Sequence, residues 1–144
     1  MKKTVTTNSF EETQMLGEDF AKTLKGGEVL ALYGDLGSGK TTFMQGLAKG
    51  LGVTRNINSP TFIIMRTYEV SSKDLGLQNL YHVDLYRIES EKDVEGLGLV
   101  ELLNDPQNIV AIEWPDKIKN ILPENKISIY FTYVDEDKRK IDFK

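Results

Sequence analysis

Residues 34–41 of this chain read GDLGSGKT, and this stretch decides the fold. It matches the pattern G-x-x-x-x-G-K-[ST], in which the backbone N–H groups of a glycine-rich loop surround nucleotide phosphates. The apolar run VLALY at residues 29–33 comes directly before it, and residues 42–48 after it have the composition of a helix. Because a strand, this loop and a helix follow one another, we predict a P-loop that binds a nucleoside triphosphate.

Two side chains of the loop are expected to carry the chemistry. Lys40 would reach the β- and γ-phosphates, and the hydroxyl of Thr41 would bind Mg²⁺. A helix beginning near Lys40 would add the positive end of its dipole to the phosphate site. The residues that we expect to contact the nucleotide are Asp35, Leu36, Gly37, Ser38, Gly39, Lys40, Thr41 and Thr42.

The composition fits one globular domain, which we predict to span residues 1–144. The formal net charge of −4 argues against independent binding to DNA or RNA, since no strong basic field would attract a phosphate backbone. The chain has no cysteine, which excludes disulfides and thiolate metal sites. It has no apolar stretch of membrane-spanning length, and Lys2 and Lys3 are not followed by the apolar core of a signal peptide. We therefore expect a cytoplasmic protein without a membrane partner.

Hydrophobic patterning predicts an α/β fold, a single-domain P-loop NTPase with a mixed central sheet flanked by helices. The continuous apolar run at residues 109–112 indicates a strand buried on both faces, which we place beside the P-loop strand near the centre of the sheet. A polar turn separates residues 61–70 from residues 80–88, so these two strands are predicted to pair antiparallel. The other predicted elements are strands at residues 5–7, 28–33, 126–134 and 138–143, a helix that begins after Ser9 and stops at Gly26, a helix at residues 40–51, and a short helical stretch that opens at residues 90–93 and is interrupted by Gly96 and Gly98.

A P-loop also needs an acidic residue that orders Mg²⁺ and water, at the carboxyl end of a buried strand. Glu113 directly follows the run at residues 109–112, and Asp84 lies in a segment of alternating apolar and polar residues. We assign Glu113 to the metal, directly or through water, and Asp84 to the attacking water or to a second water on Mg²⁺. Together with Lys40 they are the predicted catalytic residues. The simpler alternative is that either is a strand-end carboxylate that caps a helix or pairs with Arg87.

Three further features have both a functional and a simpler interpretation. Ser59, Pro60 and Thr61 follow the P-loop helix, where switch proteins place a hydroxyl that senses the γ-phosphate, but they also fit a turn that enters a strand. His82, the only histidine, fits a packed and hydrogen-bonded strand residue better than a catalyst. Trp114 would either pack near the site or serve as a partner anchor.

The sequence lacks several motifs that other classes of P-loop protein contain. The sequence has no N-K-x-D segment, which a GTPase would use to bind guanine, so ATP is the expected nucleotide. None of its four arginines lies in an obvious arginine-finger loop, and slow intrinsic hydrolysis would follow. No long lid insertion is evident, which makes a small-molecule kinase the least favoured class.

Four short blocks follow one another along the chain: GDLGSGKTT at residues 34–42, SPTF at 59–62, HVDLYR at 82–87 and IEWP at 112–115. With these blocks the chain resembles the TsaE (YjeE) family, the bacterial ATPase of tRNA threonylcarbamoyladenosine biosynthesis. The resemblance extends over nearly the whole length, in the same order and at comparable spacing. Ser38, where alanine is common, and Phe62, where tyrosine is common, are its variations.

The resemblance implies a cofactor and partners that the spacing of residues does not. Proteins of this family bind and hydrolyse ATP with Mg²⁺, and they act with the partner proteins TsaD and TsaB. That pair transfers a threonylcarbamoyl group to the adenosine beside the anticodon of certain tRNAs, and the ATPase cycle would reset the complex. An acidic chain would meet tRNA only indirectly, through this complex. The family also folds two segments toward the adenine, here residues 8–13 and 137–139.

The resemblance also implies roles for the motif residues. Thr41 and Glu113 would hold Mg²⁺, and Asp84 would be the carboxylate needed for hydrolysis. Residues 59–61 would form a nucleotide-sensitive switch, and Trp114 would lie near the nucleotide or a partner surface.

Two other functions stay open. In the first, ATP binding drives assembly of a complex and hydrolysis is incidental, so that the pair of Asp84 and Glu113 is not needed as such. In the second, the chain is a small-molecule kinase, whose ATP consumption would respond to a metabolite and not to protein partners.

Overall fold

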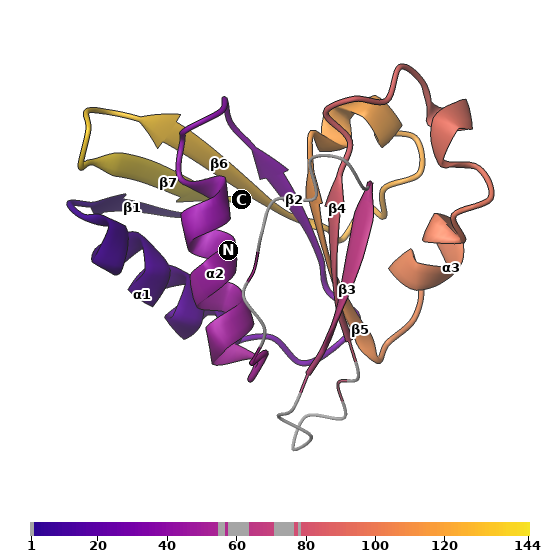
Figure 1. Cartoon of the computed structure of the whole chain (residues 1–144), viewed down its shortest axis with the longest axis horizontal. Helices are drawn as coiled ribbons and strands as arrows, with labels where there is room; N and C mark the ends of the chain where they lie inside the picture. The colour runs from indigo at the N-terminus through magenta and orange to yellow at the C-terminus, as the bar shows by residue number, and fades with distance from the viewer. Residues whose placement is uncertain (1, 55–56, 58–63, 71–76, 78) are drawn as a thin grey trace.

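A mixed sheet forms the centre of the computed structural model, which describes residues 2–54, 57, 64–70, 77 and 79–144 (Figure 1). Its strands are β1 (Lys3–Thr7), β2 (Val29–Tyr33), β3 (Met65–Glu69), β4 (Asn79–Asp84), β5 (Asn108–Glu113), β6 (Ile127–Tyr133) and β7 (Arg139–Phe143). The helices are α1 (Phe10–Ala21), α2 (Lys40–Gly50) and α3 (Leu99–Leu103), with the short 3₁₀ helices η2 (Glu91–Val94) and η3 (Pro115–Ile118).

Within the described residues the strand order is β1-β7-β6-β2-β5-β4-β3. Strand β2 runs parallel to β5 and β6, and β4 runs parallel to β5, whereas the β3–β4, β6–β7 and β1–β7 pairs are antiparallel. The predicted mixed sheet, its two central strands and the antiparallel pairing of β3 with β4 are therefore confirmed. Strand β5 is buried at every position, as its continuous apolar run predicted.

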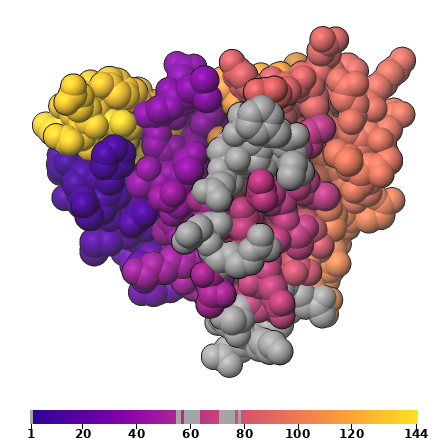
Figure 2. Space-filling model, in the orientation of Figure 1, coloured from indigo at the N-terminus to yellow at the C-terminus, as the bar shows by residue number. Residues whose placement is uncertain are grey.

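The first and last strands share one edge of the sheet. Strand β1 pairs with β7, so the indigo N-terminal segment and the yellow C-terminal hairpin lie side by side in Figure 2. Because β6 runs parallel to β2, the turn between β6 and β7 and the loop that follows β2 lie at the same edge of the sheet (Figure 1).

Two hydrophobic clusters cover the two faces of the sheet. The first contains Phe43 and Leu47 of α2 with Leu32 of β2, and the second contains Ile112 of β5 with Leu99 of α3. Since alternate residues of a strand point to opposite faces, Ile109, Ala111 and then Glu113 point toward α2. The sheet therefore delivers the end of β5 to the face that carries the P-loop helix.

Helices α1 and α2 approach each other closely at glycine positions. A Cβ added at Gly17 would meet the backbone of Phe43 and Leu47, and one at Gly46 would meet the backbone of Gln14. Contacts with backbone atoms leave little room for adjustment, so these positions accept only glycine without a shift of the helices. Helix α1 thereby fixes the position of the helix that begins at the P-loop.

The ends of several elements differ from the predicted ones. Strand β4 stops at Asp84 instead of residue 88, because the Asp84 carboxylate accepts a hydrogen bond from the amide of Tyr86 and starts a turn. Helix α1 begins after the predicted cap Ser9, whose hydroxyl accepts a hydrogen bond from the amide of Glu12 at 3.1 Å. It ends at Ala21, where turn-type hydrogen bonds replace the helical ones.

The helical stretch predicted from residue 90 is found as two pieces, η2 and α3, on either side of Gly96 and Gly98. Among the described residues, no helix has both the length and the apolar character needed to span a bilayer.

Candidate functional site: the P-loop and the ends of strands β4 and β5

The loop between β2 and α2 contains the predicted phosphate-binding residues. Gly39 is the N-cap of α2 with φ of 105°, a left-handed conformation that a residue with a side chain adopts at a cost. No side chain caps this helix, so its first N–H groups have no side-chain acceptor. Together with the helix dipole, such N–H groups form a binding place for an anion.

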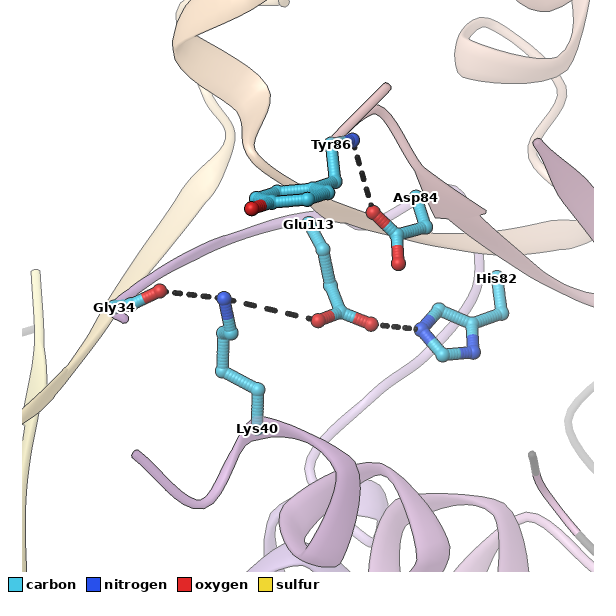
Figure 3. A network of polar contacts seen from close by, with 6 residues as sticks. All are labelled: Gly34, Lys40, His82, Asp84, Tyr86 and Glu113. Atoms are coloured by element: carbon cyan, nitrogen blue, oxygen red, sulfur yellow. Dashed lines mark hydrogen bonds and ion pairs between the residues drawn. The ribbon is translucent and has the colours of Figure 1, made fainter. Parts of the chain in front are cut away.

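Lys40 lies at the centre of the site and is 96% buried (4% exposed). Its ammonium donates a hydrogen bond to the carbonyl of Gly34 and lies 3.8 Å from Oε1 of Glu113 (Figure 3). Burial lowers the pKa of Lys40 from its ordinary value of 10.5, and the negative charges of Glu113, Asp84 and Asp35 partly oppose this shift. The carbonyl of Gly34 and the carboxylate of Glu113 thus hold the ammonium group of Lys40 beside the loop.

Glu113 ends the buried strand β5, where the sequence places it, and its two oxygens have different partners. Oε1 faces Lys40, and Oε2 lies 2.6 Å from Nε2 of His82 (Figure 3). The side chain of Glu113 is buried, so both contacts lie away from bulk water. The contact with His82 was not predicted, although the alternation of β4 places residues 82 and 84 on one face and offered a signal for it.

Asp84 ends β4 at the position paired with Glu113 in the parallel β4–β5 ladder. Its Oδ1 accepts a hydrogen bond from the amide of Tyr86 at 3.0 Å. In Figure 3 the other oxygen of Asp84 points toward the pair formed by Glu113 and His82. The structure thus places the two predicted carboxylates side by side, on the face of the sheet that carries Lys40.

Trp114 covers one side of the lysine. Its ring centroid lies 4.4 Å from the ammonium nitrogen of Lys40 and 5.2 Å from the ring of Tyr86. Its φ of 59° is the one positive value of a non-glycine residue in the described part of the chain, and it turns the backbone sharply from β5 into η3. Trp114 therefore packs beside the site, and its role as a partner anchor stays a prediction.

The residues that would hold a magnesium nucleotide fit that ligand. The Ser38 hydroxyl is buried and, among the described residues, lacks a hydrogen-bond partner, which suits a loop whose polar groups turn toward a ligand. Thr41 lies in the first turn of α2, one residue after Lys40. Within the described residues no three His, Asp or Glu side chains form a metal-binding cluster. Magnesium sites of nucleotide enzymes are built from one or two carboxylates with substrate phosphates, so Thr41 and Glu113 would be enough as protein ligands.

Four other predicted nucleotide contacts lie among the described residues, whereas the predicted switch does not. Asp35, Leu36 and Gly37 lie in the loop before α2, and the Leu36 side chain is 72% exposed. Thr42 lies in the first turn of α2. The predicted switch, Ser59, Pro60 and Thr61, lies outside the described residues.

One of the two segments implied to approach the adenine contacts the P-loop. A Cβ at Gly39 would lie 3.3 Å from Cγ of Arg139, which places residue 139 against the start of α2. The guanidinium of Arg139 stacks 4.6 Å from the ring of Tyr133 and donates to the carbonyls of Asp135, Glu136 and Lys138. These bonds hold the β6–β7 turn together, and the side chain of Arg139 lies beside Gly39 of the P-loop. In the other segment, Asn8 donates its backbone N–H to Glu12 at the start of α1.

The family model described as "Threonylcarbamoyl adenosine biosynthesis protein TsaE" matches residues 7–141. The chain belongs to the TsaE family. The resemblance drawn from the four sequence blocks is thereby confirmed, and the family is named for the biosynthesis of threonylcarbamoyladenosine.

Individual TsaE proteins match over most of their length. The tRNA threonylcarbamoyladenosine biosynthesis protein TsaE of Bacillus subtilis is 43% identical over 133 residues, which cover 92% of this chain and 79% of that protein. The protein of the same description from Nostoc sp. is 41% identical over 92% of this chain and 79% of its own length. The crystal structure of Bacillus subtilis YdiB superimposes with a TM-score of 0.78 at 34% identity, covering 99% of this chain and 84% of that one. This likeness supports the predicted α/β fold of P-loop type.

Proposed function

We propose that this TsaE-family chain binds ATP with Mg²⁺ at the P-loop and hydrolyses it as an accessory protein of tRNA threonylcarbamoyladenosine modification. In this proposal the ATPase cycle supports turnover of a complex of TsaB and TsaD. The observation that carries it is the meeting of Lys40 with two carboxylates, Asp84 and Glu113, at paired strand ends. A site that only held phosphate would not need this pair of carboxylates.

Each residue has a role that follows from its place. The uncapped N-terminus of α2 and the buried ammonium of Lys40 would bind the phosphates, and Thr41 and Glu113 would hold the metal. Mg²⁺ bound there would neutralise charge on the phosphate oxygens. Asp84, beside Glu113, would orient the attacking water.

The proposed partners follow from charge and from what the chain lacks. A net charge of −4 does not favour direct contact with tRNA, so the tRNA would be held by the partner proteins. Arg139 is the arginine placed nearest to the start of α2 by the described contacts, but its Nη1 is occupied by three backbone carbonyls. A partner would therefore complete the catalytic site, and hydrolysis by the isolated chain would be weak.

One contact favours a second function, in which ATP binding drives assembly and hydrolysis is incidental. Oδ1 of Asp84 already accepts the amide of Tyr86, and a carboxylate that only shapes this turn would not be needed for hydrolysis. The two proposals differ in the outcome expected when the charge of Asp84 is removed.

Equilibrium binding of ATP tests the proposal at its first step. Trp114 is the only tryptophan and lies beside Lys40, so its emission reports on the site. We expect the emission to change with added ATP and Mg²⁺, in the wild type and in Lys49→Ala, whose side chain is 75% exposed on the same helix. In Lys40→Ala we expect the affinity to fall by more than about a hundredfold, since a charged phosphate contact is lost. An unchanged affinity in Lys40→Ala would exclude the P-loop as the nucleotide site.

A further inference from the structure

His82 is buried completely, with 0% of its surface exposed, in the middle of the sheet. Its Cα is paired with that of Ala111 on β5, so its ring extends along the ladder to reach Glu113, two residues further on (Figure 3). The distance between Nε2 of His82 and Oε2 of Glu113 is 2.6 Å. A histidine that served only to fill the core would not need this contact with a carboxylate of the site.

The direction of the hydrogen bond follows from its acceptor. An ionised carboxylate only accepts hydrogen bonds, so with Glu113 ionised Nε2 of His82 would carry the hydrogen and donate it to Oε2. The other ring nitrogen, Nδ1, is buried and has no hydrogen-bond partner among the described residues. Within the described part of the chain, the one polar contact of this ring is therefore the bond to Glu113.

The two oxygens of Glu113 are held unequally. Lys40 lies 3.8 Å from Oε1, which is within the range of an ion pair but longer than a hydrogen bond. Nε2 of His82 lies 2.6 Å from Oε2, which is within hydrogen-bonding distance. Lys40 also has the phosphates as a partner in the proposed function, whereas the ring of His82 has no competing acceptor among the residues that the structure describes. The orientation of the Glu113 carboxylate thus depends on the histidine more than on the lysine.

We infer that His82 is a positioning residue that fixes the carboxylate of Glu113, so that Oε2 is held by the ring and Oε1 is left facing the P-loop. The inference rests on the proposed function, because it concerns the carboxylate assigned to the metal. Groups that orient a metal ligand through a hydrogen bond change metal affinity about 10- to 100-fold when they are removed. The histidine itself touches neither phosphate nor metal in this arrangement.

Two substitutions separate positioning from packing. In His82→Gln, the side-chain amide nitrogen can occupy the place of Nε2 and donate to Glu113, whereas the side chain in His82→Asn is too short to reach it. Both remove the ring, so a purely structural role predicts similar losses of thermal stability and of function. We expect His82→Asn to weaken the binding of ADP with Mg²⁺ about tenfold, as measured by Trp114 emission, with the Mg²⁺-free affinity for ADP unchanged. We expect His82→Gln to restore most of the Mg²⁺-dependent affinity.

A measurement on the folded wild-type chain makes the test independent of variant stability. Since the chain has one histidine, a sample labelled with ¹⁵N-histidine gives the signals of a single ring. We expect a slowly exchanging, downfield proton on Nε2 that shifts in Glu113→Gln. A ring protonated on Nδ1 alone, or an Nε2 proton that exchanges rapidly, would overturn the inference.

The binding data also distinguish a failure of the positioning role of His82 from a failure of the proposed nucleotide site. If the wild type binds ADP with Mg²⁺ but His82→Asn and His82→Gln lose affinity equally, or His82→Asn loses none, the positioning role is wrong and the nucleotide site stands. If ADP with Mg²⁺ leaves the wild-type emission unchanged and equilibrium dialysis detects no bound ADP, the proposed nucleotide site fails and the inference fails with it.

Discussion

The ammonium nitrogen of Lys40 lies 3.8 Å from Oε1 of Glu113, and this ion pair joins the start of α2 to the end of β5. Both side chains are almost fully buried, so the charges meet in an environment that screens them less than water does. Each of the two side chains depends on the other, because removing one would leave the opposite charge buried without its partner.

The charge of Asp84 is the first target. We expect Asp84→Asn to lower ATP hydrolysis by the chain in its partner complex by about 100-fold or more, the scale of a lost general base or water-orienting group. The amide oxygen of the substituted side chain can still accept the amide of Tyr86, so the turn after β4 should persist. Steady-state hydrolysis and ATP binding are measured together, and binding should change less than about threefold, because the phosphate contacts remain.

The same variant decides between the two proposed functions. If tRNA modification continues at the wild-type rate while hydrolysis is lost, hydrolysis is incidental and the assembly function is correct. If hydrolysis itself continues at the wild-type rate, the role assigned to Asp84 is wrong.

Trp114 is expected to contribute through its ring. An ammonium over an aromatic face is stabilised by about 0.5–2 kcal/mol, so Trp114→Ala should weaken ATP binding several-fold while Trp114→Phe keeps most of it. Isothermal titration calorimetry is the appropriate measurement, since these variants lack the fluorescent residue. Equal affinities in Trp114→Ala and the wild type would show that the ring does not support the lysine.

The close approach of α1 and α2 predicts a large effect of a small substitution. Gly46→Ala should lower the free energy of unfolding by about 1–3 kcal/mol or more, because its Cβ would overlap the backbone of Gln14. Lys49→Ala, an exposed position on the same helix, serves as the control and should change it by less than about 0.5 kcal/mol. Urea unfolding measures both, and a neutral Gly46→Ala would mean that the helices separate at little cost.

The turn between β6 and β7 should lose stability in acid. The amides of Lys138 and Asp137 donate to the Asp135 carboxylate, and they lower its pKa below the ordinary 3.8. The pKa of Asp135 is lower in the folded chain than in the unfolded chain, where it has its ordinary value of 3.8. The hydrogen bonds to this carboxylate therefore stabilise the fold fully above about pH 3.8, and this stabilisation is lost as the pH falls through the folded pKa.

Asp135→Asn removes this titration but keeps an acceptor oxygen. We expect the thermal unfolding temperature of the wild type to fall more steeply than that of Asp135→Asn when the pH is lowered below about 3.8. Parallel pH profiles for the two proteins would contradict the assigned cause.

The position of Glu113 at the end of a buried strand could be predicted from the sequence for a physical reason, whereas the place of Asp84 at the end of β4 could not. A continuous apolar run indicates a strand buried on both faces, and the carboxyl ends of parallel strands meet at one edge of the sheet. The glycine-rich motif likewise fixed the strand, loop and helix around Lys40. The β4–β5 register then completes what the pattern predicts, because Asp84 and Glu113 are direct partners in the ladder.

Other features depended on distances between elements, which a single sequence does not contain. The bond between His82 and Glu113 requires the register of β4 against β5, and the stacking of Trp114 beside Lys40 requires the left-handed turn after β5. Strand β4 also ends earlier than its alternation predicts, because Asp84 forms a turn with Tyr86. The expected switch at residues 59–61 lies outside the described residues and stays a prediction.

Partner-activated hydrolysis at the P-loop is tested by measuring ATP hydrolysis by the purified chain, alone and then with TsaB and TsaD, for the wild type and for Lys40→Ala. We predict low activity for the isolated wild type, a clear increase with the two partners, and no activity of Lys40→Ala in either condition. Activity that ignores these partners would contradict the proposed pathway while leaving the P-loop as the nucleotide site. Wild-type activity in Lys40→Ala would contradict the site itself.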